Sequence, residues 1–78
     1  MKNLFKLAEE IVERFGEKTF YNIDISEDYL RLQGDINTED EAIRLLLNDN
    51  SFSYREQEPD WLVFEKIVSG AYIKIQFL

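Results

Sequence analysis

Two stretches in which apolar and polar residues alternate most limit what this chain can fold into. The first covers residues 19–34, TFYNIDISEDYLRLQG. A period of two residues predicts strands, because successive side chains of a strand point to opposite faces of a sheet. A turn centred on Glu27 and Asp28 makes both faces of the hairpin complementary. The predicted pairs are Ile25 with Leu30, Ile23 with Leu32 and Tyr21 with Gly34 on the apolar face, and Asp24 with Arg31 and Asn22 with Gln33 on the polar face.

The second alternating stretch lies at the end of the chain and predicts another hairpin, with strands over residues 61–67 and 71–78. Ser69 and Gly70 form a two-residue turn of the kind that hairpins favour. This turn pairs Phe64 with Ile75, Leu62 with Phe77 and Glu65 with Lys74. A further strand is predicted over residues 51–56, and Pro59 marks the turn after it.

The first of two predicted helices covers residues 4–15. Its apolar residues recur at helical spacing and define one face, which Phe5 and Val12 widen. The core of this face consists of Leu4, Leu7, Ala8, Ile11 and Phe15. Asn3 is a suitable N-cap and Gly16 a suitable residue after the last turn, so both ends of the helix carry their expected signals.

A second helix is predicted within residues 38–49, TEDEAIRLLLND. Thr38 and Glu41 have the spacing of a capping box, in which each side chain accepts a hydrogen bond from the backbone N–H of the other residue. Glu39 and Asp40 then lie in the first turn, where the helix dipole favours negative charge. Helix capping therefore accounts for this acidic segment without a metal ion.

The resulting order, αββαβββ, predicts an α+β fold: a five-stranded, largely antiparallel sheet with two helices packed on it. A chain of 78 residues has room for one core, so residues 1–78 are expected to form a single domain. The strand order stays open, because the connection through the second helix can place the third strand parallel to the second or elsewhere.

The chain contains no cysteine and no histidine. Thiolate nucleophiles, imidazole bases and the usual zinc ligands are therefore missing. Residues 35–46 differ from a calcium-binding loop, because Asp40 stands where glycine is needed and Leu46 where a bidentate glutamate is needed. We therefore predict a protein that is not an enzyme and has no catalytic residue, no cofactor and no metal. A carboxylate enzyme that binds Mg²⁺ or Ca²⁺ is the remaining catalytic alternative.

The formal net charge is −7, and residues 9–41 alone carry eleven acids and three bases. This charge repels nucleic acid and attracts basic surfaces. We predict a protein-binding module that docks on a basic protein surface, most concretely an inhibitor of a nucleic-acid-binding protein that imitates a row of phosphates. Solubility alone is the alternative explanation of the charge. The candidate contact residues are Glu9, Glu10, Glu13, Glu27, Asp28, Glu39, Asp40 and Glu41.

The predicted outer face of the sheet is unusually apolar, and it contains Trp61, Val63, Ile67, Tyr72 and Leu78. We expect one of the protein's own helices to cover these residues. If the face is bare, the alternative function is a structural or homo-oligomerising module, for example a homodimer. It would associate through Trp61 and Tyr72 or through the edge of the terminal strand.

Charged residues interrupt the apolar residues at the beginning of the chain, MKNLFKLAEEIVERF, so it does not resemble a signal peptide. No stretch is long enough to span a bilayer, and contact with a membrane is not expected. We expect a cytoplasmic protein, in the host cytoplasm if a phage encodes it. Small phage-encoded antagonists and toxin-neutralising proteins share this small, acidic character.

Overall fold

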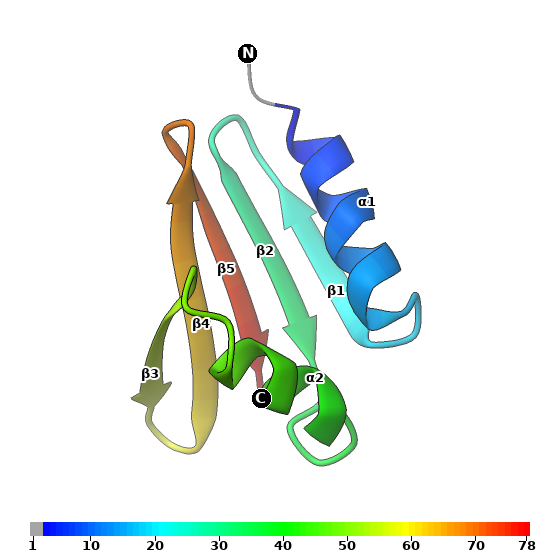
Figure 1. Cartoon of the computed structure of the whole chain (residues 1–78), viewed down its shortest axis with the longest axis vertical. Coiled ribbons are helices and arrows are strands. Elements are labelled where there is room, and N and C mark those ends of the chain that lie inside the picture. Colours follow the sequence, from blue (N-terminus) through cyan, green and yellow to red (C-terminus); the bar gives the residue numbers. More distant parts are fainter. Residues whose placement is uncertain (1–2) are drawn as a thin grey trace.

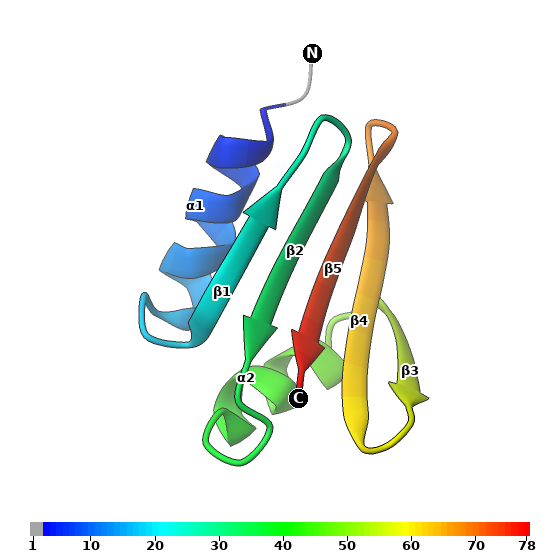
Figure 2. The ribbon, with the colours of Figure 1, turned by 180° about the vertical axis from the view of Figure 1, so that it is seen from behind.

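In the computed structural model, which describes residues 3–78, two helices lie on one face of a five-stranded sheet (Figures 1 and 2). The elements are α1 (Leu4–Phe15), β1 (Phe20–Ile25), β2 (Tyr29–Gly34), α2 (Asp40–Leu47), β3 (Ser53–Gln57), β4 (Trp61–Val68) and β5 (Ala71–Phe77). This order and the largely antiparallel sheet confirm the predicted α+β fold. Across residues 3–78, no helix is long and apolar enough to cross a membrane.

The strand order is β1-β2-β5-β4-β3, and only the contact between β2 and β5 is parallel within the described sheet. The last strand of the chain is therefore central, and β1 and β3 form the edges. This excludes the predicted association through an edge of the terminal strand, because the backbone groups of β5 are already paired on both sides. Ile75 and Phe77 of β5 have no exposed surface.

Both ends of α1 are as predicted. The side-chain oxygen of Asn3 accepts a hydrogen bond from the backbone N–H of Lys6 at 3.0 Å. Gly16 has a φ of 105°, and its N–H donates to the carbonyl of Val12 at 2.7 Å. Glycine suits this place because a positive φ strains residues that carry a side chain.

The second helix begins later than predicted, and the predicted capping box of Thr38 and Glu41 is wrong. α2 starts at Asp40, and no side chain caps it. A turn precedes the helix, in which the carbonyl of Asp35 accepts the N–H groups of Thr38 at 3.3 Å and Glu39 at 3.1 Å. Thr38 belongs to this turn, and its hydroxyl donates to the carboxylate of Glu39 at 3.0 Å.

The two predicted hairpins form with the expected registers, except at the beginning of β1. The turn at Ser69 and Gly70 has a positive φ at both residues, 50° and 82°, which matches the twist of the flanking strands. In β1, Phe20 rather than Tyr21 lies opposite Gly34, because the register shifts between Phe20 and Asn22. This bulge points the Phe20 ring into the core, and Tyr21 is left 62% exposed.

The core fills the space between the inner face of the sheet and the two helices. Its aromatic centre is Phe77, whose ring centroid lies 6.2 Å from that of Phe20 and 6.1 Å from that of Phe64. The buried residues of this core are Leu4, Ala8, Phe20, Leu30, Leu32, Ala42, Ile43, Leu46, Phe64, Ala71, Ile73, Ile75 and Phe77.

No described helix covers the outer face of the sheet, which is open to the viewer in Figure 2. The prediction that a helix covers this face is therefore wrong. Both helices pack against the inner face, because that face carries the large aliphatic side chains of β2 and β5 that need to be buried.

Candidate protein-binding surface

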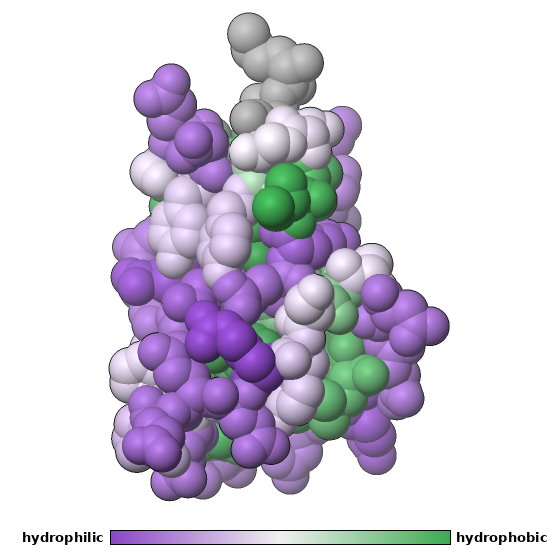
Figure 3. All heavy atoms as spheres, turned by 90° about the vertical axis from the view of Figure 1, so that its left-hand side faces the viewer, coloured by the Kyte–Doolittle hydropathy of each residue, from purple (hydrophilic) through white to green (hydrophobic). Residues whose placement is uncertain are grey.

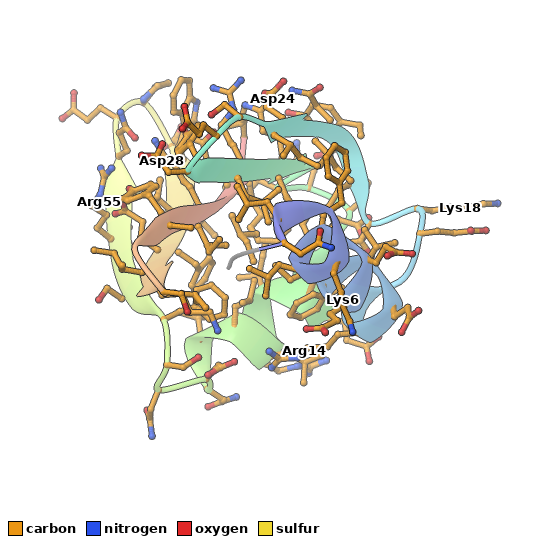
Figure 4. The ribbon with its side chains drawn as sticks, turned by 90° about the horizontal axis from the view of Figure 1, so that it is seen from above. Lys6, Arg14, Lys18, Asp24, Asp28 and Arg55 are labelled. Carbon is orange, nitrogen blue, oxygen red and sulfur yellow. The ribbon has the colours of Figure 1, made fainter. Side chains whose placement is uncertain are left out.

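The acidic side chains of α1 are exposed. Glu9, Glu10 and Glu13 all lie at the surface, and none of them forms an ion pair with any residue in the range 3–78. They belong to the helical layer, from which Lys6 and Arg14 also project in the view from above (Figure 4). The three carboxylates are therefore free to meet a partner.

Arg14 is the cation of the last turn of α1, and an internal contact uses it. Its Nη1 lies 2.8 Å from Oδ2 of Asp49, which follows α2. The same carboxylate accepts hydrogen bonds from the hydroxyl of Ser51 at 2.7 Å and from its N–H at 2.9 Å. The hydrogen bonds from Ser51 and then from Arg14 hold the pKa of Asp49 far below its usual range. The charge of Arg14 is thus balanced by Asp49 rather than by the glutamates of α1.

The acids at the beginning of α2 lie near the end of α1. Glu39 is half-buried, whereas Asp40 and Glu41 are exposed. Glu39 and Glu41 line a cavity of about 230 Å³ together with Arg14, which joins the acids of α2 to the helical layer. The structure therefore places six of the eight predicted acidic contact residues, those of the two helices, on one side of the sheet.

Glu27 and Asp28 are separate from this group. They form the turn between β1 and β2, which lies at the opposite end of the sheet from α2 (Figure 1). The carbonyl of Asp28 accepts the N–H of Tyr72 at 2.9 Å, so this turn is tied to β5. The helical acids and the turn acids do not form one continuous group.

Trp61 and Tyr72 both lie on the outer side of the sheet, but at different ends of β4. Tyr72 pairs with Ile67, six residues from Trp61, which is about 20 Å along a strand. Tyr72 stacks on Tyr29 of β2 with ring centroids 5.5 Å apart. Trp61 instead lines a cavity of about 530 Å³ beside Ile36 and the turn between β3 and β4.

Polar residues occupy the outer face between these aromatic residues. Arg31 forms an ion pair with Asp24, and the hydrogen bond from this partner raises the pKa of Arg31. Arg55 pairs with Glu65 at 2.6 Å. At the neighbouring β3 edge of the sheet, Figure 3 shows separate apolar groups within a mostly hydrophilic surface. The predicted apolar set is therefore split by charged residues and is not a continuous patch.

The structure contains a groove between α1 and β1 that the sequence by itself did not indicate. This α1–β1 groove has a volume of about 380 Å³ and is lined by Phe5, Ala8, Glu9, Val12, Glu13, Ile23 and Ile25. Phe5 is 70% exposed and Ile23 is 40% exposed. One signal was available: Phe5 and Val12 make the apolar face of the helix wider than one sheet can cover.

No group of three or more Asp or Glu side chains among residues 3–78 is placed to hold a metal ion. Comparisons of the chain with protein-family models, with curated proteins and with solved structures found no match.

Proposed function

We propose that this protein is a non-enzymatic binding module whose acidic helical layer docks on a basic surface of another protein. The observation that supports this function is the set of three exposed glutamates on α1, which have no ion-pair partner within residues 3–78. Glu9 and Glu13 lie on the β1 side of the helix, and Glu10 lies on its other side. Arg14, the cation of the last turn, is held by Asp49 at 2.8 Å, which leaves Lys6 as the other cation of this helix. The negative field of α1 is therefore not neutralised by its own last turn.

The acids at the start of α2 extend this surface past the cavity that they share with Arg14. A surface with several carboxylates on one side attracts a cluster of Lys and Arg, and such clusters are typical of proteins that bind nucleic acid. The most concrete form of the proposal is an antagonist that occupies a nucleic-acid-binding groove in place of the phosphates.

The test compares two triple variants with the same change in net charge. The first replaces Glu9, Glu10 and Glu13 of α1 by Gln. The control carries Glu56→Gln, Glu58→Gln and Asp60→Asn, which change exposed acids around the turn between β3 and β4. Wild type and both variants are immobilised, and proteins bound from a lysate of the source cells are recovered and purified.

We expect a basic partner that binds wild type and the control variant alike and binds the α1 variant at least about tenfold more weakly. Raising the salt from about 0.1 M to about 1 M should release it, because the Debye length falls from about 10 Å to about 3 Å. Duplex DNA or RNA should compete for the purified partner. If both variants lose the same affinity for the partner, net charge alone explains binding and the α1 surface is not specific. If the partner binds nucleic acid and this protein at the same time, the antagonist mechanism is wrong.

A second candidate function is self-association through the open outer face. One observation favours it: Ile67 is 73% exposed and lies opposite Tyr72, whose ring stacks on Tyr29. A homodimer of this kind would resist salt, because its contacts are apolar. Sedimentation of wild type and of Ile67→Glu and Trp61→Glu tests it, and a wild type that stays monomeric at high concentration excludes it.

A further inference from the structure

The α1–β1 groove lies beside an edge of the sheet. Among the described strands, β1 pairs only with β2, so its other edge has no strand partner. Such an edge presents unpaired N–H and C=O groups, and an extended segment of another protein can add to it as a further strand. In Figures 1 and 2, α1 runs alongside β1, so an added strand would also lie along the helix.

The groove combines apolar lining with an acidic rim. Val12, Ile23 and Ile25 line its apolar part, and Phe5 forms one end. Phe5, Glu9 and Glu13 follow one another at intervals of four residues on α1, which is about 6 Å per step along a helix. Alternate side chains of a strand point to the same side at intervals of about 6.6 Å. The row on α1 therefore matches three successive inward positions of an added strand.

From this match we infer that the α1–β1 groove binds an extended basic segment of a partner protein as a sixth strand on β1. One inward side chain of this segment is apolar and packs against Phe5. The next two inward side chains are Lys or Arg, whose aliphatic stems cover Val12 and whose charged ends reach Glu9 and Glu13. This inference rests on the proposed function, in that the partner is the basic protein that the acidic layer attracts.

Charge complementarity distinguishes this occupant from a second copy of the chain. Two copies joined along β1 would bring Glu9 and Glu13 of one chain close to the same residues of the other. Lys6, three residues before Glu9, can offset only part of this repulsion, and the other nearby cations are already paired, Arg14 with Asp49 and Arg31 with Asp24. A basic segment gains from the same carboxylates that a second copy would find repulsive.

The experiment selects binders from a displayed library of random peptides that are long enough to form a strand. The full chain is the target, and Ile23→Thr is the variant that weakens the groove while keeping a strand-forming residue. Ile67→Thr is the matched control, because Ile67 is a more exposed isoleucine on β4, away from β1. Circular dichroism and a thermal melt show that each variant is folded.

We expect the selected peptides to carry Lys or Arg at alternate positions next to an apolar residue. Affinity of a synthesised peptide should fall about tenfold for Ile23→Thr, which loses a buried aliphatic contact, and stay within about twofold for Ile67→Thr. Peptide binding should also slow hydrogen exchange of backbone N–H groups in β1. Selection on Glu9→Gln with Glu13→Gln should remove the basic residues from the consensus.

Three results would overturn this inference: no enriched peptides, equal weakening by both threonine variants, or a consensus with apolar residues at helical spacing. If wild type forms a salt-resistant dimer and Ile23→Thr does not, the occupant of the groove is a second copy of the chain rather than a basic segment. If the captured basic protein binds Ile23→Thr normally but binds the α1 glutamine variant weakly, the groove inference is wrong and the proposed function stands. If basic peptides bind the groove but no basic protein is captured, the proposed function is wrong and the groove inference stands.

Discussion

Gly34 ends β2 at a place where two other segments come very close. It lies opposite Phe20 of β1 and beside Phe77 of β5. A Cβ atom at this position would lie 2.9 Å from two ring carbons of Phe77 and 2.9 Å from the backbone oxygen of Thr19. Real Cβ atoms do not approach other atoms so closely, so Gly34→Ala must displace one of these neighbours. Neither moves easily, because Phe77 has no exposed surface and the oxygen of Thr19 belongs to the backbone.

Two opposing effects determine how much Gly34→Ala changes the free energy of unfolding. Overpacking in a filled core costs about 1–3 kcal/mol. Alanine also restricts the unfolded chain, which stabilises the protein by about 0.4–1 kcal/mol. The packing cost is larger, so we expect the free energy of unfolding to fall by about 1–2 kcal/mol. For a domain of this size, the melting temperature should fall by about 5–15 °C.

Urea unfolding of wild type and Gly34→Ala measures this change. An unchanged slope of the free energy of unfolding against urea concentration shows that the unfolded state is the same in both. Adding Phe77→Leu should remove part of the clash, so the double variant should lose less stability than the sum of the two single variants. An unchanged or higher urea midpoint for Gly34→Ala would refute the close approach of β2, β5 and Thr19.

Three further predictions concern the ends of elements and one carboxylate. Asn3→Ala should lower the free energy of unfolding by about 1 kcal/mol, because the Lys6 N–H loses its acceptor, and a thermal melt measures this change. The control is Asn50→Ala, which changes an exposed asparagine. Asp49 has a lowered pKa in the folded chain, so its stabilising effect is complete above the unfolded pKa of about 3.9 and is lost as the pH falls through the lower folded value. The difference in urea midpoint between about pH 7 and about pH 3 should therefore be smaller in Asp49→Asn than in wild type, and an equal difference would contradict this. Deleting residues 75–78 should abolish cooperative unfolding, because it removes Ile75 and Phe77 from the core, and a retained sharp melt would show that β5 is dispensable.

The sequence alone determined the features that depend on neighbouring residues. Asn3 and Gly16 mark the ends of α1 through hydrogen bonds within a few residues of the chain. The hairpin of β4 and β5 follows from its alternation and from the turn at Ser69 and Gly70. In both cases the energetic reasons are local, so a short window of sequence contains them.

Tertiary structure decided how these elements meet. Contacts between distant segments place β5 between β2 and β4. They also place both helices on the inner face of the sheet and leave its outer face without a helix. The ring of Phe20 takes the inward place predicted for Tyr21, because Phe15 and Phe77 surround it in the folded chain. The α1–β1 groove likewise exists only because the sheet ends at β1 and leaves Phe5 and Ile23 uncovered. Sequence patterns identify which residues are apolar, but the number of neighbours available to bury them depends on contacts between distant segments.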